Sequence, residues 1–353
     1  MAETQELMEA REEIEAMMAR ARAAQEQIAD YTQEQVDQLI TAMVWAVARE
    51  DRSEEIAQFT VEETQLGNYA GKYLKIHRKT RATLMDIIDD KSVGVIEEDP
   101  ERNIVKIAKP VGVIGALSPS TNPEATPVIK AISAVKGRNA IIVAPHPRAK
   151  LTNKKICDYM REAIVAMGGP ADLVQSIDVP SLDKTNELMR QCDRVLATGG
   201  EAMVSAAYSS GTPALGVGVG NAVITVDDSA DLDEAADKIR TSKTLDLAAS
   251  CSSDNSVLVF ESIYDEFLEK LKHEGGFVIE GEDKEKLQNV IWKDGYLNAD
   301  IVAQHALTIT GKAGIDLPEG KQFLIVPETG AGPDYPFSGE KLTVTMALYK
   351  VKD

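Results

Sequence analysis

The chain reads Val111-Gly112-Val113-Ile114-Gly115-Ala116-Leu117 and then Ser118-Pro119-Ser120-Thr121-Asn122-Pro123, which is a buried strand followed by a turn. A helical pattern of apolar residues comes next and is closed by Gly137. The same alternation recurs, with strands expected over 140–144, 173–177 and 194–197, and helices over 154–167, 182–191 and from Thr198 to about Tyr208. This succession predicts an α/β fold, a doubly wound parallel sheet of the Rossmann type with helices on both faces.

The sequence on either side of this region sets the domain organisation. An apolar stripe predicts a helix over 3–29, and the capping-box pair Thr32 and Gln35 predicts the start of a second helix. After the sheet region, helices are expected over 232–245 and 263–272 and a strand over 343–350. A length of 353 residues fits two domains. We therefore expect a first domain with the N-terminal helices and the doubly wound sheet over 1–228, and a second α/β domain over 229–353.

Composition excludes several classes of function. The net charge of −19 argues against a nucleic-acid surface, which needs clustered Lys and Arg. No apolar run is long enough to span a bilayer, and the acidic N-terminus has no apolar signal region, so a cytoplasmic protein is predicted. The three cysteines have neither a disulfide framework nor metal-ligand spacing, so no metal site is predicted.

Cys251 is the candidate nucleophile. It lies in the polar stretch Ser250-Cys251-Ser252-Ser253-Asp254-Asn255, just before an apolar strand pattern. A thiol on a polar loop at the start of a strand is accessible to a substrate and close to backbone N–H donors. The alternative is an inert, buried cysteine. Cys157, by contrast, shares the apolar face of a helix and is expected in the core.

Three turns are candidates for ligand binding, because ligands bind at the carboxyl ends of parallel strands. They are residues 118–123, 145–148 and 198–200. The last opens a helix, whose free N–H groups suit a pyrophosphate. The glycine-rich loop 216–221 is different, because its spacing is G-x-G-x-G and a strand follows it. It therefore does not fit a nucleotide fingerprint. We interpret it as a loop of close approach, in which glycines allow the backbone to come near another group.

A set of motifs in fixed order carries a family resemblance. The motifs are Lys109-Pro110-Val111-Gly112-Val113-Ile114, Thr121-Asn122-Pro123, Pro145-His146-Pro147-Arg148-Ala149-Lys150, Ala197-Thr198-Gly199-Gly200, Ala207-Tyr208-Ser209-Ser210-Gly211, residues 216–221, Cys251-Ser252-Ser253 and Pro336-Phe337-Ser338-Gly339-Glu340-Lys341-Leu342. Together they resemble the CoA-acylating branch of the aldehyde dehydrogenase superfamily, which includes enzymes for acetaldehyde, succinate semialdehyde and sulfoacetaldehyde. The resemblance covers nearly the whole chain.

The resemblance implies a role for each site residue. Cys251 matches the nucleophile, and Asn122 matches the amide of the oxyanion hole. On the cofactor side, which takes NAD or NADP, the matching residues are Thr198, Gly199 and Gly200 at the diphosphate, Glu340 at the nicotinamide-side ribose, His146 and Arg148 near the adenosine ribose, and Gly218 in the loop of close approach.

The resemblance also predicts the acceptor of the acyl group. Hydrolytic members of the superfamily carry a glutamate in the loop that matches 216–221, yet residues 211–221 of this chain contain no acidic side chain. Coenzyme A is therefore expected to take the acyl group from Cys251. The family usually has Phe-Asp-Asn-Gly before the nucleophile, whereas this chain has Leu245-Asp246-Leu247-Ala248-Ala249-Ser250. A specialised small aldehyde is therefore expected as the substrate. The favoured substrate is sulfoacetaldehyde or an acetaldehyde-like compound, and the alternative is succinate semialdehyde.

Three expectations concern the protein as a whole. The family continues beyond Asp353 with a Gly-His-Thr motif and further strands, so the second domain is expected to be incomplete and turnover by this chain slow. A homo-oligomer, either a dimer or a tetramer, is expected for the full-length form. The alternative of another class is an inactive nucleotide-binding or assembly subunit.

Overall fold

The computed structural model describes residues 4–352, and the chain divides into two compact units. One unit comprises Met1–Gln65 and Lys72–Gly218, and the other comprises Leu66–Gly71 and Val219–Asp353. The expected boundary between residues 228 and 229 differs from this division. The reason is β8 (Ala222–Val226), which was assigned to the first domain but pairs in parallel with β9 (Asp254–Phe260) of the second unit.

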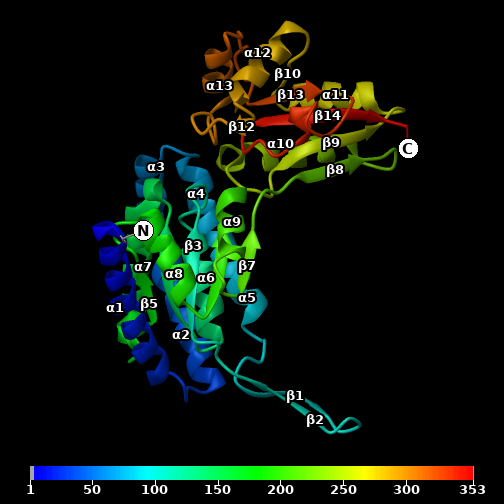
Figure 1. Cartoon of the computed structure of the whole chain (residues 1–353). Coiled ribbons are helices and arrows are strands. Elements are labelled where there is room, and N and C mark those ends of the chain that lie inside the picture. Colours follow the sequence, from blue (N-terminus) through cyan, green and yellow to red (C-terminus); the bar gives the residue numbers. More distant parts are fainter. Residues whose placement is uncertain (1–3, 353) are drawn as a thin grey trace. The chain divides into compact units, whose positions relative to one another are not determined.

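A five-stranded parallel sheet forms the centre of the first unit (Figure 1). Its order is β5-β4-β3-β6-β7, with β3 (Val113–Ser118), β4 (Ala140–Pro145), β5 (Val174–Ser176), β6 (Arg194–Thr198) and β7 (Ala214–Val217). Every residue of β3 and β4 is buried, as expected for strands covered on both faces. The strand order reverses at β3, so the crevice at the carboxyl ends of β3 and β6 is the topological switch point of the sheet.

Helices cover both faces of this sheet. Helices α6 (Thr126–Lys136) and α7 (Lys150–Ala166) pack with α2 (Gln33–Ala48), whereas α8 (Leu182–Gln191) packs with α1 (Gln5–Gln27). The remaining elements are α3 (Glu50–Thr64), α4 (Tyr69–Lys75), the π-helix η1 (Ile76–Thr80), α5 (Arg81–Ile87), α9 (Glu201–Tyr208) and the 3₁₀ turns η2 (Pro147–Ala149) and η3 (Ala171–Leu173). The predicted doubly wound α/β fold is confirmed.

The N-terminal helices begin where the sequence indicates. Thr4 caps α1 by accepting a hydrogen bond from the Leu7 N–H, and Thr32 with Gln35 forms the predicted capping box of α2. The first residues of the predicted helix over 3–29 lie partly outside the described residues. None of the helices within residues 4–352 is both long enough and apolar enough to cross a membrane.

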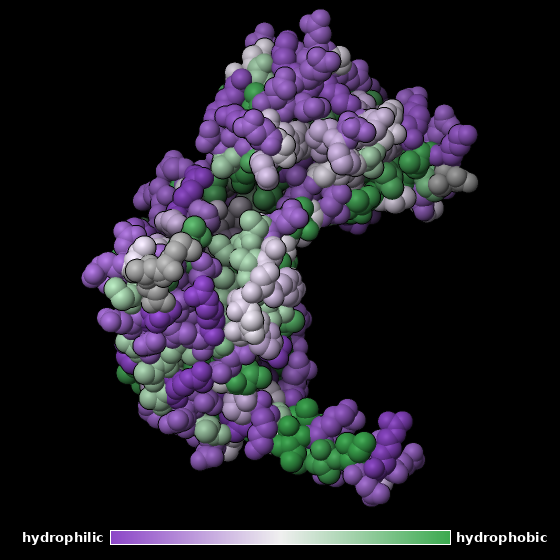
Figure 2. Space-filling view, in the orientation of Figure 1, coloured by the Kyte–Doolittle hydropathy of each residue, from purple (hydrophilic) through white to green (hydrophobic). Residues whose placement is uncertain are grey.

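A two-stranded hairpin of the first unit was not predicted. It consists of β1 (Gly94–Asp99) and β2 (Ile104–Ala108), paired antiparallel. Figure 2 shows its apolar side chains at the surface, and their exposed fractions run from 37% to 54%. The exposed apolar residues are Val95, Ile96, Ile104, Val105 and Ile107.

The second unit contains its own parallel sheet, in the order β10-β13-β14-β9-β8. Its other strands are β10 (Gly276–Val278), β13 (Phe323–Pro327) and β14 (Thr345–Val351). Helices α10 (Leu232–Thr244), α11 (Tyr264–His273), α12 (Glu282–Ile291) and α13 (Ala306–Ala313) accompany it, with the turns η4 (Leu245–Ala248) and η5 (Pro336–Ser338) and the short pair β11 (Trp292–Lys293) and β12 (Tyr296–Leu297). The strand predicted over 343–350 is β14, which lies inside the sheet between β13 and β9.

Candidate active site

Cys251 is the exposed thiol of the chain. It lies on the turn between η4 and β9, whereas Cys157 and Cys192 are buried. Burial raises the pKa of the Cys157 thiol to about 12 and that of the Cys192 thiol to about 11, so both remain protonated and unreactive at neutral pH. The expectation that Cys157 is a core residue is confirmed.

Backbone and hydroxyl contacts hold the turn that carries Cys251. The Ser253 N–H donates to the Ser250 carbonyl at 3.0 Å, and the Ser253 hydroxyl donates to the Ser242 carbonyl at 3.3 Å. The Asp254 N–H donates to the Ser242 hydroxyl at 3.2 Å. The end of α10 therefore fixes the residues that follow the thiol, while the thiol itself stays at the surface.

Glu340 and Cys251 meet at Gly220. The Gly220 N–H donates to Glu340 Oε1 at 3.3 Å. A Cβ on Gly220 would lie 3.2 Å from the Cys251 carbonyl oxygen, 3.7 Å from the Cys251 Cβ and 3.6 Å from Glu340 Oε1. The glycine loop is therefore a loop of close approach, and Gly220 is the glycine next to the thiol. Gly218, the position chosen from the sequence, instead faces Val204 of α9 in the first unit.

A buried charged cluster lies beneath Glu340 and was missed by the sequence analysis. Lys243 and Lys341 are both fully buried. Desolvation lowers the pKa of Lys243 to about 7 against the attraction of Asp254 and Glu340, and it lowers the pKa of Lys341 well below its ordinary value. Burial also raises the pKa of Glu340, opposed by the Gly220 N–H and the two lysines. A lysine inside an amphipathic helix is usually exposed, so the sequence offered no signal for this cluster.

The Lys341 ammonium nevertheless has good hydrogen-bond acceptors. Its Nζ donates to the carbonyls of Phe337 and Gly339 at 2.6 and 2.8 Å. Its backbone N–H donates to the buried Asn255 side chain at 3.2 Å. These contacts close the loop before Glu340 and hold that carboxylate in place.

In the first unit, the predicted catalytic residue Asn122 and the predicted cofactor residues share the carboxyl edge of the sheet. Asn122 follows β3, His146 follows β4, and Thr198, Gly199 and Gly200 lead from β6 into α9. The His146 N–H donates to the Ser118 carbonyl at 3.0 Å, which ties two of these turns together. A Cβ on Gly200 would meet no atom within 4 Å, so the turn is open at that position.

Two of the predicted side chains have partners within the protein. The Arg148 guanidinium donates from Nη2 to the Thr64 carbonyl at 2.8 Å, and the Arg148 N–H donates to His146 Nδ1 at 3.1 Å. Burial and the nearby Arg148 charge lower the pKa of His146. Both side chains remain at the surface, so they remain candidates for contact with a nucleotide.

The loop that carries Asn122 is held by buried charges. The Lys72 Nζ donates to the Thr121 carbonyl at 2.8 Å and lies 3.5 Å from Glu124 Oε2, and the Lys75 Nζ lies 3.7 Å from Glu124 Oε1. All three charged side chains are fully or almost fully buried. Asn122 itself donates to the Thr121 hydroxyl at 3.1 Å.

A partly buried lysine also marks the switch point. The Lys130 Nζ donates to the carbonyls of Leu117 in β3 and Leu196 in β6, at 2.6 and 2.8 Å. Burial lowers the pKa of Lys130 to about 7. Sequence reasoning missed this residue because it lies within an apolar helical pattern.

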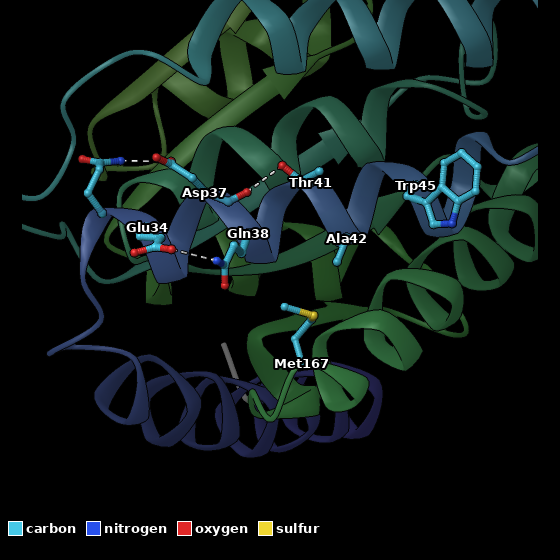
Figure 3. A pocket seen from close by; sticks show the side chains of 8 residues that line it. Glu34, Asp37, Gln38, Thr41, Ala42, Trp45 and Met167 are labelled. Carbon is cyan, nitrogen blue, oxygen red and sulfur yellow. Dashed lines mark hydrogen bonds between the residues drawn. The ribbon is translucent and has the colours of Figure 1, made fainter.

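The groove in Figure 3 is not part of this site. It encloses about 760 Å³ along α2, and its lining comprises Gln33, Glu34, Asp37, Gln38, Thr41, Ala42, Trp45 and Met167. Its polar groups bond one another, as in the contact from Gln38 Nε2 to Glu34 Oε1 at 3.1 Å. None of the predicted site residues lines it.

The fold and these residues define a class of protein. A doubly wound sheet with open turns at its switch-point edge suits a dinucleotide, and an exposed thiol beside a carboxylate suits covalent catalysis. The family model described as "Aldehyde dehydrogenase family" matches residues 3–284. The chain belongs to the aldehyde dehydrogenase family.

Three relatives narrow the placement to the predicted acylating branch. The chain is 46% identical to a sulfoacetaldehyde dehydrogenase of an Acholeplasma species, over 95% of this chain and 70% of the relative. It is 43% identical to the acylating sulfoacetaldehyde dehydrogenase of Cupriavidus necator, over 98% of this chain and 70% of the relative. The crystal structure of an acetylating aldehyde dehydrogenase from Geobacillus thermoglucosidasius matches with a TM-score of 0.94 and 38% identity, over 99% of this chain and 77% of that chain. The predicted membership of the acylating branch is confirmed, and it supports a nucleotide cofactor and coenzyme A as the co-substrate.

Proposed function

We propose that this chain oxidises a small aldehyde to its acyl-CoA, with reduction of NAD or NADP, through a thioester on Cys251. The observation that carries the proposal is the exposed Cys251 thiol next to Gly220 and Glu340, while the two other thiols are buried. The relatives' names favour sulfoacetaldehyde as the aldehyde. Succinate semialdehyde and acetaldehyde are the alternatives.

The covalent chemistry belongs to Cys251. Its thiolate adds to the aldehyde carbon, a C–S bond forms, and the carbonyl π-electrons move to oxygen. The Asn122 amide and the Cys251 backbone N–H stabilise that oxyanion, and loss of one such donor costs roughly 100- to 1000-fold in rate. A nicotinamide bound at the residues assigned below would supply the acceptor for a hydride from this carbon, and loss of that hydride would let the electron pair of the oxygen re-form the carbonyl. A thioester on Cys251 results.

The acyl group then passes from one sulfur to another. A CoA thiolate adds to the thioester carbonyl, the C–S bond to Cys251 breaks, and Cys251 leaves as a thiolate. The absence of any acidic side chain from residues 211–221 supports CoA over water as the acceptor. Glu340 is the carboxylate beside Gly220, and we assign it to the nicotinamide-side ribose and not to water activation.

The remaining predicted residues form the nucleotide side of the proposal. Thr198, Gly199 and Gly200 receive the diphosphate at the open turn before α9, with backbone N–H groups as donors. His146 and Arg148 lie where an adenosine ribose is expected, and contact of Arg148 with a 2′-phosphate would favour NADP. Gly220, not Gly218, is the glycine of this loop that lies close to Cys251 and Glu340.

The test is an aldehyde panel assayed with NAD⁺ or NADP⁺, with and without CoA. Cys251→Ala should abolish aldehyde-dependent formation of the reduced nucleotide, whereas the buried control Cys157→Ala should retain it. Full-rate multiple turnover to a free acid without CoA would refute the choice of acceptor. Nucleotide binding with no aldehyde oxidation in the wild type would favour the alternative of an inactive nucleotide-binding subunit.

We also propose that the chain forms a homo-oligomer. The apolar side chains at the surface of the β1–β2 hairpin support this, because a contiguous apolar surface on a small hairpin needs a covering partner. Ile107→Lys with Val105→Lys should lower the mass measured by light scattering. An unchanged mass would remove the hairpin from the interface.

A further inference from the structure

Six residues from the N-terminal part of the chain belong to the second unit. Leu66–Gly71, named the strap below, group with residues 219–353, although the residues on either side belong to the first unit. Leu66 is buried in the core of the second unit. The Gly67 N–H donates to the Ala303 carbonyl at 3.0 Å. The strap is therefore anchored independently of the thiol.

The strap fits tightly around Asp246. The Asn68 N–H donates to Asp246 Oδ1 at 2.9 Å, and Asp246 is 1% exposed. A Cβ on Gly67 would lie 1.9 Å from that same oxygen, and a Cβ on Gly71 would lie 2.5 Å from the Asp246 Cα. Neither glycine leaves room for a side chain, so the strap encloses both the carboxylate and the backbone of Asp246.

Asp246 opens a turn of unusual backbone geometry that leads to the thiol. Asp246, Leu247 and Ala248 have φ values of 50°, 53° and 61°, which is the left-handed region. The Ala249 N–H donates to the Asp246 carbonyl at 3.1 Å, and Cys251 follows two residues later. Left-handed geometry costs a residue other than glycine roughly 1–2 kcal/mol, so surrounding structure must hold this turn. The strap contacts the first residue of this turn through the Asn68 N–H.

The strap is also connected to the loop of Glu340. Ala303, which accepts from Gly67, donates its own N–H to the Leu342 carbonyl at 2.8 Å. Leu342 lies two residues after Glu340. The same short segment is thus bonded to the turn before Cys251 and, through Ala303, to the loop after Glu340.

We propose that the strap positions the thiol, with Asp246 as a positioning residue and Gly67 and Gly71 as the glycines that make the fit possible. The assignment rests on the proposed function of Cys251. Asp246 acts through the turn and does not touch the substrate. A misplacement of about 1 Å at a reacting group can cost roughly 100-fold in rate, so small shifts of this turn matter.

The experiment compares two helical glycines of the second unit. Gly71→Ala pushes a methyl into the Asp246 backbone, whereas Gly311→Ala in α13 is the matched control, since a Cβ there meets no atom within 4 Å. The first readout is the rate of Cys251 alkylation by iodoacetamide across pH, resolved by peptide mass spectrometry. The second is kcat/KM for the aldehyde together with nucleotide affinity.

We expect Gly71→Ala to shift the pH profile of Cys251 alkylation and to lower kcat/KM by about 100-fold, with nucleotide affinity unchanged. Gly311→Ala should match the wild type. Asp246→Ala should behave like Gly71→Ala, whereas Asp246→Asn, which keeps the oxygen that accepts from Asn68, should restore the wild-type profile.

Wild-type alkylation and turnover in folded Gly71→Ala overturn the proposal. If Gly71→Ala does not fold, the two Asp246 variants test the proposal instead. Equal alkylation profiles and equal kcat/KM of Asp246→Ala and Asp246→Asn would then overturn it. If the wild type oxidises no aldehyde, the proposed function fails, but the alkylation comparison still tests the strap.

Discussion

Two neighbouring alanines before the thiol should lose different amounts of stability when each is replaced by glycine. Ala248 has φ of 61° and Ala249 has φ of −65°, and both are fully buried. Replacing either by glycine removes one buried methyl group, worth about 0.8 kcal/mol. It also adds backbone freedom to the unfolded chain, worth about 0.5–1 kcal/mol. Ala248→Gly alone also releases left-handed strain of about 1–2 kcal/mol.

These magnitudes predict different outcomes for the two variants. For Ala248→Gly the gain and the losses cancel, so the free energy of unfolding should stay within about 0.5 kcal/mol of the wild type. For Ala249→Gly nothing offsets the losses, so the second unit should lose about 1.5 kcal/mol. The expected difference between the variants is therefore about 1–2 kcal/mol, set by the strain.

Urea denaturation can measure this difference in the second unit alone. The chain has two tryptophans, and Trp292 packs edge-to-face on Phe337 within that unit, with ring centroids 5.0 Å apart. Trp45 is 67% exposed, so Trp45→Phe provides a background in which fluorescence reports Trp292. Equal destabilisation by the two glycine variants would show that the turn is not strained as described.

Three further predictions concern buried charges and thiols. Lys243→Met should stabilise the second unit most at neutral pH and below. Burial lowers the folded-state pKa of Lys243 to about 7, so the unfolded chain binds one more proton at this lysine between pH 7 and 10.5, and wild-type stability rises with pH across that window. Because Lys341 adds a rise of the same sign, urea titrations of the variant should show a smaller rise than the wild type, and an equal rise would contradict the prediction. Glu124→Gln should lower the free energy of unfolding of the first unit by about 3 kcal/mol, because Lys72 and Lys75 lose the carboxylate they contact. A urea midpoint equal to that of the wild type would contradict this prediction. A thiol reagent at pH 8 should titrate one cysteine in the native protein and all three in denaturant, and rapid native titration of all three would contradict the burial of Cys157 and Cys192.

Much of the first unit could be predicted because local sequence and burial agree there. Helix α8 (Leu182–Gln191) matches its predicted range, and the strands at 140–144 and 194–197 appear within a residue or so of their expected ends. The β1–β2 hairpin was missed because both of its strands are exposed, which leaves no alternation of buried and exposed residues to detect. The expected boundary near residue 228 differs from the observed division because the pairing of β8 with β9 depends on tertiary contacts that the local sequence does not show.

The candidate site was predictable to a different extent at each residue. Cys251 stood out by its polar neighbours, and the structure leaves it exposed. The choice of Glu340 as a site residue came from the family resemblance alone, and its contact with Gly220 was not predicted, since no periodicity connects residues so far apart in the chain. Gly220 was missed because all three glycines of the loop look alike in sequence, and only the fold decides which one faces the thiol.

The left-handed turn explains why local sequence fails at this site. Of the three residues with positive φ, only Asp246 is of a type that is enriched in that region, whereas Leu247 and Ala248 are poorly suited to it, so the local sequence does not indicate the turn. The family's usual Asp-Asn-Gly would fit such a turn more easily, because Asn and Gly tolerate left-handed geometry. The conformation must therefore be imposed by contacts outside the turn, and the strap supplies one of them, because the Asn68 N–H donates to Asp246 Oδ1. A substitution that relaxes the turn and one that disturbs the strap should for this reason differ in kind: Ala248→Gly leaves the free energy of unfolding close to its wild-type value, whereas Gly71→Ala changes the reactivity of Cys251.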